Sequence, residues 1–382
     1  MVCECKCKTK AKVLSQFDLI YYVALSKLKG VGPVLAKNLI GYCGSAKAVF
    51  ESSKSKLEKI PGIGTVGAKN VLDNAAAFEF AENEIEFCKK SNVSILTNAD
   101  KKYPKRLKHC IDAPIVLYTK GNANFNASKM VAVVGTRNCT DYGKELCAKI
   151  AEDFKAYNIT LVSGLAYGID YNAHKCAVQN NLENIAVLAH GLDRIYPAVH
   201  TNLSKKIMEN GSLLTEFSSN TNPDRENFPK RNRIVAGMTD ATIVVESGEK
   251  GGALITAYLA RDYNRDVFAF PGKANDTYSI GCNNIIRKNV AGLITNVNDF
   301  LEAMNWNVEE KNTSKNRQRT LLIDLNADEQ NIVELLNEHN TLTLDMLCTK
   351  SKIALGKLNA VLLQMEMKNI VVATPGNKYK LL

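Results

Sequence analysis

The sequence contains no apolar run long enough to cross a membrane, although 46% of its residues are hydrophobic. Its first residues, MVCECKCKTK, are charged and lack the apolar stretch of a secretory signal. We therefore expect a globular, cytoplasmic protein with no membrane partner. A chain of 382 residues is long enough for two or three domains.

Motifs of several common catalytic sites are also missing. No G-x-x-x-x-G-K-[ST] segment occurs, which argues against a P-loop nucleotide hydrolase. No group of His, Cys and Asp residues has the spacing of a metal site, and no Ser–His–Asp order is evident. The C-x-C-x-C cluster of Cys3, Cys5 and Cys7 has no further ligand nearby, so we interpret it as part of a disordered tail. We expect no cofactor, no bound metal and no catalytic residue.

Four side chains leave a catalytic role open. His174 follows a predicted helix start, where capping or packing is the better interpretation, and His190 follows an apolar run and could line a crevice. Glu216 and Glu246 each end a predicted strand. Either glutamate could be a catalytic acid or a structural partner of a helix dipole.

Basic residues outnumber acidic ones. The chain has 49 Lys and Arg against 39 Asp and Glu, a net charge of +10. Residues 1–60 alone hold 11 lysines and 4 acidic residues. Such a surplus suits a polyanionic partner such as nucleic acid. Solubility alone is the alternative, and charge by itself does not decide between them.

An internal repeat lies within residues 19–97, which we expect to be helical. The segments LKGVGPVLAKNL at 28–39 and IPGIGTVGAKNV at 60–71 both place G-x-G before a helical pattern. This arrangement resembles the helix-hairpin-helix motif, in which glycines permit a tight turn against a nucleic-acid backbone. Plain helix packing is the alternative. The stretch Gly62–Gly67 also matches a dinucleotide fingerprint, but SSKSKLEKIP precedes it instead of a strand, so we reject that interpretation.

Strand and helix patterns alternate from about 129 to 295. The expected strands are 130–135, 159–163, 185–189, 212–215, 241–246, 266–270 and 291–294. The expected helices are 141–156, 169–180, 202–210, 252–264 and 282–289. This alternation predicts an α/β fold, an extended Rossmann-like parallel sheet with helices on both faces.

The C-terminal region has a different pattern. Residues 307–320 are polar and read as a linker, and 328–382 contains three helical patterns followed by IVVATPGNKYKLL, which predicts a winged helix. We therefore expect four segments: a helical helix-hairpin-helix (SAM-like) domain at 1–100, a Rossmann-like domain at 101–306, a linker at 307–326 and a winged-helix domain at 327–382. A transcription regulator acting through this last domain ranks low, because it has few arginines.

Four loops of the central region carry glycines, cations and aromatic residues. Three of them follow predicted strands and should meet at one edge of the sheet, where open α/β sheets bind ligands. The remaining segment, at 227–233, is expected to be a loop that carries three cations. The candidate binding residues are Gly135, Thr136 and Arg137; Ser163, Gly164, Tyr167 and Gly168; Phe228, Lys230, Arg231, Asn232 and Arg233; and Gly251 and Gly252.

These residue types suit a phosphorylated ligand. Glycines allow close approach of a backbone, helix N-termini favour phosphate, and arginine forks match phosphate oxygens. Phe228 or Tyr167 could stack on a base, a contact worth roughly 1–3 kcal/mol in proteins that bind single strands. Each loop has a structural alternative, such as a tight turn or a core side chain. Their combination favours a binding site that needs no reaction.

The same segments resemble the DNA-processing protein A family, also called DprA or Smf. The resemblance rests on VAVVGTRNCTDYG at 131–143, LVSGLAYGIDYNAH at 161–174, AVLAHGLDRIYPAVHTNL at 186–203, LLTEF at 213–217, NFPKRNRIVAGMTDATIVVESGEKGGALITA at 227–257, DVFAFPG at 266–272 and GCNNIIR at 281–287. The resemblance implies a non-enzymatic protein that binds single-stranded DNA, protects incoming strands during natural transformation and loads the RecA recombinase. It also implies a homodimer formed through the Rossmann domain, and it places thirteen of the fourteen candidate residues, all except Tyr167, around the DNA.

One position departs from that pattern. The family usually has Arg or Lys where this chain has Tyr167. The change removes a phosphate-binding cation and adds a ring that can stack. The alternative to the DNA-binding interpretation is a Rossmann-type enzyme of the lysine-decarboxylase-like superfamily that releases a base from a nucleoside monophosphate. Its P-G-G-x-G-T-x-x-E loop is not matched by SGEKGGALIT at 247–256.

Overall fold

The computed structural model describes residues 16–306, 326–339, 341–368, 370–374 and 378–381. The chain divides into two compact units, one ending at Val308 and the other beginning at Glu309. The cluster of Cys3, Cys5 and Cys7 and almost all of the expected linker at 307–326 lie outside the described residues. Within the described ranges, no helix is both long enough and apolar enough to span a membrane.

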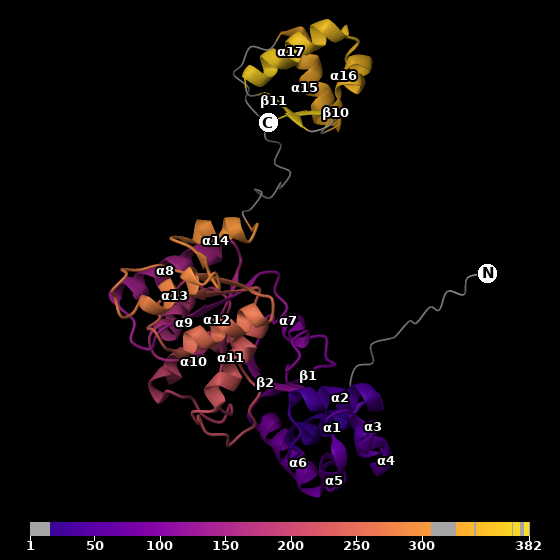
Figure 1. Ribbon diagram of the computed structural model, residues 1–382, viewed down its shortest axis with the longest axis vertical. Coiled ribbons are helices and arrows are strands. Elements are labelled where there is room, and N and C mark those ends of the chain that lie inside the picture. Colours follow the sequence, from indigo (N-terminus) through magenta and orange to yellow (C-terminus); the bar gives the residue numbers. More distant parts are fainter. Residues whose placement is uncertain (1–15, 307–325, 340, 369, 375–377, 382) are drawn as a thin grey trace, which may run out of the picture. The chain divides into compact units, whose positions relative to one another are not determined.

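The first unit begins with a bundle of short helices beside one edge of a large sheet (Figure 1). The helices are α1 (Gln16–Lys27), α2 (Pro33–Cys43), α3 (Ala46–Phe50), α4 (Lys54–Glu58), α5 (Gly64–Leu72) and α6 (Ala75–Lys90). Their apolar side chains share one core, in which Leu25, Leu39 and Leu57 are fully buried. The expected helical region therefore forms, except that its last residues, Ser94–Thr97, are a strand.

The two copies of the repeat form similar glycine turns. Gly30 and Gly62 have φ angles of +77° and +86°, in the left-handed region that glycine adopts without strain. Helices α2 and α5 begin just after these turns, and Asn70 Nδ2 on α5 donates to the carbonyl oxygen of Lys29 at 2.9 Å. The residues before the second copy form helix α4, so the strand that a dinucleotide fingerprint requires is replaced by a helix.

The centre of the first unit is a nine-stranded sheet. Its strands are β1 (Ser94–Thr97), β2 (Val116–Gly121), β3 (Met130–Val134), β4 (Thr160–Ser163), β5 (Asn184–Val187), β6 (Gly211–Thr215), β7 (Ala241–Val244), β8 (Asp266–Ala269) and β9 (Gly292–Leu293). Their order is β1-β2-β6-β5-β4-β3-β7-β8-β9, and the neighbours from β6 to β9 are parallel. The seven strands expected from the sequence are all present, with ends that agree to within about two residues.

Helices cover both faces of the sheet. They are α7 (Lys105–Lys108), α8 (Asp141–Ala156), α9 (Ile169–Gln179), α10 (Thr201–Glu209), α11 (Asn227–Gly237), α12 (Gly252–Asp262), α13 (Ile280–Arg287) and α14 (Val297–Ala303). Alternate residues of β3 serve the two faces: Ala132 and Val134 join the core under α11, α12 and α13, whereas Val131 and Val133 join the core under α8, α9 and α14. The predicted α/β class with a Rossmann-like, predominantly parallel sheet is confirmed.

Two features of this unit differ from the sequence-based expectation. First, the sheet is mixed, because β1 and β2 extend it and pair antiparallel with each other and with β6. Second, residues 227–233 are not a loop but the first two turns of helix α11. Pro229 stands in the first turn of that helix, where its missing N–H costs no hydrogen bond. A proline and five polar or basic residues had obscured the helical pattern.

Among its described residues, the second unit has three helices and three short strands. They are α15 (Ala327–His339), β10 (Leu342–Thr343), α16 (Leu344–Ser351), α17 (Leu355–Met367), β11 (Val371–Thr374) and β12 (Lys378–Leu381). The strands form an antiparallel sheet in the order β10-β12-β11. Glu329 is fully buried and pairs with Lys368 at 2.7 Å, which fixes α15 against the end of α17. The expected winged helix is confirmed, and the Pro-Gly turn expected between its last two strands lies outside the described residues.

Candidate nucleic-acid interface

A crevice opens where the strand order changes direction, between β3 and β7. From β3 the chain proceeds outward to β4, β5 and β6, whereas from β7 it proceeds the other way to β8 and β9. The loops after β3 and β7 therefore diverge, and open α/β sheets bind ligands at such switch points. The resulting cavity has a volume of about 320 Å³ and is lined by Val134, Gly135, Thr136, Arg137, Gly164, Ala166, Asp170, Phe228, Arg231, Asn232, Val235, Ser247, Gly248, Lys250, Gly251, Gly252, Ala253 and Thr256.

The loop after β3 forms one wall of the cavity. A Cβ atom on Gly135 would collide with the side chain of Ile169, so only glycine fits there. The amide of Thr136 donates to the carbonyl oxygen of Glu246 at 2.8 Å, which joins this loop to the end of β7. Arg137 is exposed at the mouth of the cavity. The loop thus holds its backbone rigidly and leaves a guanidinium at the surface.

The sequence left two roles open for Glu246, a catalytic acid or a partner of a helix dipole, and the contacts of Glu246 fit the second. Its carboxylate accepts hydrogen bonds from the amide and the hydroxyl of Thr140, the residue that caps helix α8. The hydrogen bond from the amide of Thr140 is 2.9 Å long. A carboxylate at a helix N-terminus is stabilised by the helix dipole.

The loop after β4 lies beneath the first loop. The hydroxyl of Ser163 donates to the carbonyl oxygen of Val133 at 2.7 Å, so Ser163 is a buried link between strands. Gly168 has a φ of +74°, and a Cβ atom there would collide with the backbone of Thr136 and Arg137. These two predicted residues support the cavity from below. Gly164, in contrast, lies on its surface.

Helix α11 supplies the floor of the cavity. Arg231 is only 4% exposed, and its guanidinium donates to the carbonyl oxygens of Gly164 and Val187, the latter at 2.7 Å. Asn232 donates to the carbonyl oxygen of Gly252 at 3.2 Å and so ties α11 to α12. Arg231 therefore uses some of its hydrogen-bond donors to hold these loops together.

Charge is balanced beneath this floor. Burial raises the pKa of the Asp170 carboxyl, and the nearby Arg231 opposes that shift. Burial also lowers the pKa of Arg231, and Asp170 opposes that shift in turn. Asp170 Oδ2 accepts a hydrogen bond from the amide of Gly164 at 3.2 Å. The pair provides a largely neutral base for the cations at the surface.

The N-terminus of helix α12 faces the cavity. Its cap, Gly251, has an extended backbone and no side chain, so no side-chain hydrogen bond closes the end of the helix. Gly252 and Ala253 begin the helix and line the cavity, and Lys250 stands beside them in an exposed position. Unpaired amides and the positive end of the helix dipole favour a phosphate here.

Aromatic side chains continue the surface beyond the crevice. Phe228 borders both the main cavity and a smaller one of about 50 Å³, together with Tyr167, His190, Tyr196 and Pro197. The rings of Tyr196 and Phe228 lie 6.3 Å apart, and Tyr167 packs edge-on against His200 at 5.1 Å. Tyr167 and Tyr196 remain 47% and 45% exposed, so their ring faces are accessible to a base.

Two predicted cations lie apart from the cavity. Lys230 is exposed on the outer side of α11. Arg233 points away and forms an ion pair with Glu216, and it also donates to the carbonyl oxygen of Asp112. Burial raises the pKa of the Glu216 carboxyl, although Arg233 opposes the shift. Arg233 and Glu216 therefore form a structural ion pair. Arg233 faces away from the cavity because neighbouring positions on a helix cannot all face the same side.

The histidines near the crevice are held by the protein itself. Burial lowers the pKa of His174 to about 4, and its Nδ1 donates to Asn184 Oδ1 at 3.0 Å. His190 donates from Nδ1 to the carbonyl oxygen of Gly191 and accepts from the amide of Tyr196, at 2.8 and 3.2 Å. Within the described ranges, no group of three His, Cys, Asp or Glu side chains is arranged to hold a metal ion.

Sequence reasoning did not include three residues of this surface among the candidates. Lys250 lay inside a segment expected as a loop, and its place between two glycine positions was the available signal. Asp170 was expected near the start of the helix at 169–180. Tyr196 stands in the segment DRIYPAVH, where nothing in the local pattern indicates that it packs beside Phe228. Its position depends on a contact between segments more than thirty residues apart, which a local pattern does not reveal.

Models of three protein families match the chain. The DNA recombination-mediator protein A model matches residues 94–305, the DprA winged helix domain matches 317–377, and a SAM-like helix-hairpin-helix tandem matches 22–77. Protein Smf from Synechocystis is 33% identical over 402 aligned residues, which cover 96% of this chain and all of the relative.

Two solved structures are similar to a large part of the chain. DNA processing protein A from Streptococcus pneumoniae matches with a TM-score of 0.61 and 30% identity, covering 76% of this chain and 98% of that one. DNA processing protein A from Helicobacter pylori, described for its single-stranded DNA binding mode, matches with a TM-score of 0.51 and 29% identity. That match covers 56% of this chain and 95% of the other.

Proposed function

The chain belongs to the DNA recombination-mediator protein A family of DNA-processing proteins, and on that premise we propose that it binds single-stranded DNA without sequence preference in the crevice between β3 and β7. One observation carries the proposal: the main cavity, lined by phosphate-binding groups, adjoins the smaller cavity, lined by exposed aromatic rings, and Arg137 and Phe228 line both. The amides at the start of α12, together with Arg137 and Lys250, suit a phosphate backbone, and Phe228, Tyr167 and Tyr196 suit unpaired bases.

The contacts in this crevice explain why no base sequence would be preferred. Every base has a ring face that can stack on tyrosine or phenylalanine, and phosphates are the same along the strand. A duplex would hide its ring faces, so the aromatic surface favours a single strand. The residues proposed to contact or support the strand are Gly135, Thr136, Arg137, Ser163, Gly164, Tyr167, Gly168, Phe228, Lys230, Arg231, Asn232, Gly251 and Gly252, with Lys250 and Tyr196 added. Arg233 is left out because it pairs with Glu216.

A role in DNA processing follows from the same premise. We propose that the protein protects incoming single strands and delivers them to the RecA recombinase, that it acts as a homodimer formed through the Rossmann-like domain, and that it has no enzymatic activity. The proposed domains are 1–100, 101–306 and 327–382, joined by a linker at 307–326. The single-stranded DNA binding described for the Helicobacter pylori protein supports the DNA-binding part.

Fluorescence anisotropy with a labelled, short oligo-dT tests the crevice directly. We expect Arg137→Ala combined with Lys250→Ala, which removes two cations that line the cavity, to weaken binding about 10- to 100-fold at moderate salt. We also expect the slope of log K against log salt to shrink by about 0.7 for each phosphate that the variant no longer neutralises. The matched control is Arg287→Ala with Lys288→Ala, which removes one arginine and one lysine exposed at the end of α13. Equal affinity of both double variants and the unaltered protein would remove the crevice from consideration.

The partner and assembly proposals need separate measurements. Sedimentation of the full chain should show a dimer, and single strands coated with the protein should be taken up by RecA faster than bare strands covered by a single-strand-binding protein. A monomer at micromolar concentration, or no acceleration of RecA filament growth, would contradict these two proposals without affecting DNA binding.

A further inference from the structure

A second basic surface lies at the other edge of the same sheet. It is a groove of about 550 Å³ between β1, β2 and the loops 101–105 and 122–126. Gly121, at the end of β2, pairs with Ser212 at the start of β6, so this groove lies where the parallel strands begin. The crevice lies where they end. We call this surface the lysine groove, and its residues are Ser94, Leu96, Lys101, Lys102, Lys105, Thr119, Gly121, Asn122, Ala123, Asn124, Phe125 and Asn126.

Three lysines give the groove its charge. Lys101, Lys102 and Lys105 are exposed, and within the described ranges their ammonium groups form no hydrogen bond or ion pair. Two carboxylates next to groove residues, those of Asp100 beside Lys101 and of Glu183 beside Asn124, accept hydrogen bonds from other groups. Asp100 accepts from the amide and hydroxyl of Thr97 at 2.6 and 2.9 Å, and Glu183 accepts from the amide of Asn124 at 2.7 Å. In the part of the chain that the structure describes, the three ammonium groups are therefore free of ion pairs and available to an anion.

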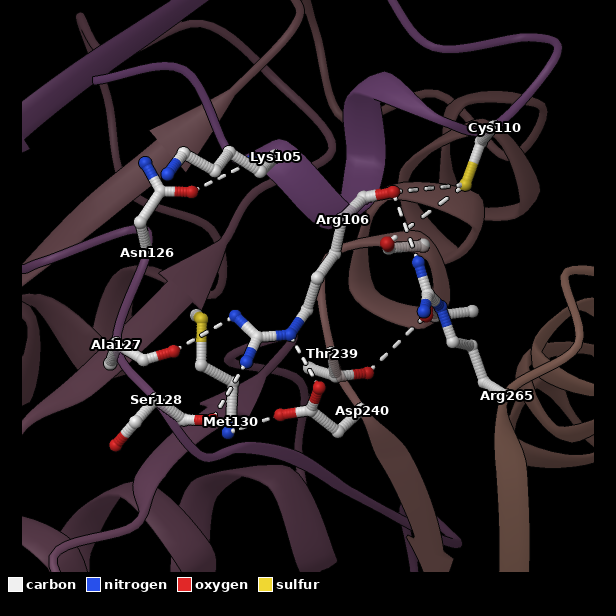
Figure 2. A network of polar contacts seen from close by, with 12 residues as sticks. Lys105, Arg106, Cys110, Asn126, Ala127, Ser128, Met130, Thr239, Asp240 and Arg265 are labelled. Carbon is white, nitrogen blue, oxygen red and sulfur yellow. Dashed lines mark hydrogen bonds and ion pairs between the residues drawn. The ribbon is translucent and has the colours of Figure 1, made fainter. Parts of the chain in front are cut away.

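The two walls of the groove are fixed to each other. Asn126 Oδ1 accepts from the amide of Lys105 at 2.8 Å (Figure 2). Asn126 Nδ2 donates to the carbonyl oxygen of Tyr103 at 3.2 Å. The next residue along α7, Arg106, completes the link. The lysines therefore project from a backbone that is already positioned, which lowers the entropic cost of binding.

Arg106 anchors this corner to the sheet. Its guanidinium donates to the carbonyl oxygens of Ala127 and Ser128 at 2.9 and 3.0 Å and pairs with Asp240 at 2.5 Å (Figure 2). Asp240 also accepts from the amide of Met130, the first residue of β3. Each of the three guanidinium nitrogens of Arg106 donates in this network, and Arg106 does not line the groove, so the cations of the lining are lysines.

The kind of ligand follows from what the groove presents. Exposed lysines act as hydrated point charges that meet phosphates without fixed geometry, and asparagine amides can donate to phosphate or sugar oxygens. Phe125, the aromatic residue of the lining, is 7% exposed and packs into the core, so it offers no ring face to a base. We propose that the lysine groove binds the phosphodiester backbone of a second polynucleotide segment, single- or double-stranded, independently of the crevice.

Lysine acetylation read by mass spectrometry tests the proposal on the full chain. We expect a long oligo-dT and a DNA duplex each to protect Lys101, Lys102 and Lys105 at least about 5-fold, both in the unaltered protein and in Arg137→Ala. Equal acetylation with and without DNA would overturn the proposal. Protection that disappears in Arg137→Ala would also overturn it, because the groove would then depend on the crevice. Equal protection by inorganic tripolyphosphate at the same phosphate concentration would assign the groove to small polyphosphates instead.

Substitution gives a second readout. We expect the triple variant Lys101→Gln, Lys102→Gln and Lys105→Gln to bind duplex DNA about 10-fold more weakly, with a salt slope smaller by up to about 2, while short oligo-dT binds as before. The matched control replaces three exposed lysines of α8 and α9 with glutamine: Lys149, Lys155 and Lys175. Equal loss in both triple variants would reduce the effect to net charge and overturn the proposal. Loss of short oligo-dT binding in Arg137→Ala, with duplex binding retained, separates the groove from the crevice.

Discussion

The guanidinium of Arg137 lies over the ring of Phe228, 5.2 Å from its centre, and both side chains border the main cavity and the smaller aromatic one. The contact joins the loop after β3 to the first turn of α11. A cation over an aromatic face is attracted by the ring's electrons, and the ring in turn keeps the guanidinium in place. The phosphate-binding and base-stacking parts of the proposed interface are therefore coupled at this contact.

Phe228→Leu tests that coupling. Leucine keeps an apolar side chain but offers no flat ring, so oligo-dT binding should weaken by roughly 1–3 kcal/mol. Because Arg137 then loses its support, the combined variant with Arg137→Ala should lose less than the sum of the two single losses. Anisotropy titrations of the four proteins give this double-mutant cycle. Phe228→Tyr, which keeps the ring, should bind nearly as well as the unaltered chain, and strict additivity would contradict the coupling.

Tyr167 is the position where the chain departs from the pattern of its family. Its ring is 47% exposed and held against His200, so it is placed to stack rather than to bind phosphate. Tyr167→Lys should therefore steepen the slope of log K against log salt by about 0.7 and strengthen binding at low salt. At high salt the variant should bind more weakly, because it has no ring to stack on a base. Titrations over a range of salt concentrations check whether the two binding curves cross, and parallel curves would argue against a DNA contact at this position.

Arg231 matters first for folding. It is 4% exposed and donates to two backbone carbonyl oxygens beneath the crevice. Arg231→Met keeps the length of the side chain but leaves those carbonyls and the Asp170 carboxyl without their partner. Removing one member of a buried charged pair costs about 3–5 kcal/mol, so the free energy of unfolding should fall by that order. Urea denaturation measures it.

A paired substitution distinguishes this role from direct DNA binding. Arg231→Met with Asp170→Asn removes both charges, so it should recover part of the lost stability. If Arg231→Met unfolds at the same urea concentration as the unaltered protein, the guanidinium is not structural, and any loss of DNA affinity would then reflect direct contact.

Periodicity in the sequence was sufficient to locate the parallel core. The buried strands, such as Val131–Val134, are short apolar runs that end in glycine or serine, and the helices between them have clear apolar faces. Strands β1 and β2 were not predicted, because β2 joins the sheet by antiparallel pairing with β6, far away in the sequence, and β1 in turn pairs with β2. The start of helix α11 was not predicted, because its buried positions include Asn227, Arg231 and Asn232. These residues carry polar groups that find hydrogen-bond partners only in the folded structure.

In the candidate site, too, some residues could be predicted from the sequence and others could not. Loop residues fixed by backbone geometry, such as Gly135 and Gly168, were recognisable because only glycine fits there. The roles of the neighbouring cations were not, because Lys230, Arg231 and Arg233 lie on one helix and point in three directions. A helical register decides which of them faces the ligand, and that register was hidden while the segment was interpreted as a loop.

His174 gives the protein a predictable response to acid. It is fully buried beside Asn184, and burial lowers its pKa from 6.5 to about 4. Above pH 6.5 the imidazole is neutral in both the folded and the unfolded chain. As the pH falls from 6.5 toward 4, the unfolded chain takes up a proton that the folded protein does not, so the free energy of unfolding decreases.

The shift from 6.5 to about 4 corresponds to a loss of about 3 kcal/mol over that pH interval. His174→Leu should be less stable at neutral pH, because Asn184 Oδ1 loses its donor, yet its stability should decline less steeply as the pH falls. Denaturation curves collected between neutral pH and pH 4 test this, with His109→Gln as the control, because His109 is exposed. The control should follow the unaltered protein throughout. If His174→Leu declines as steeply as the control, the acid sensitivity arises from other groups.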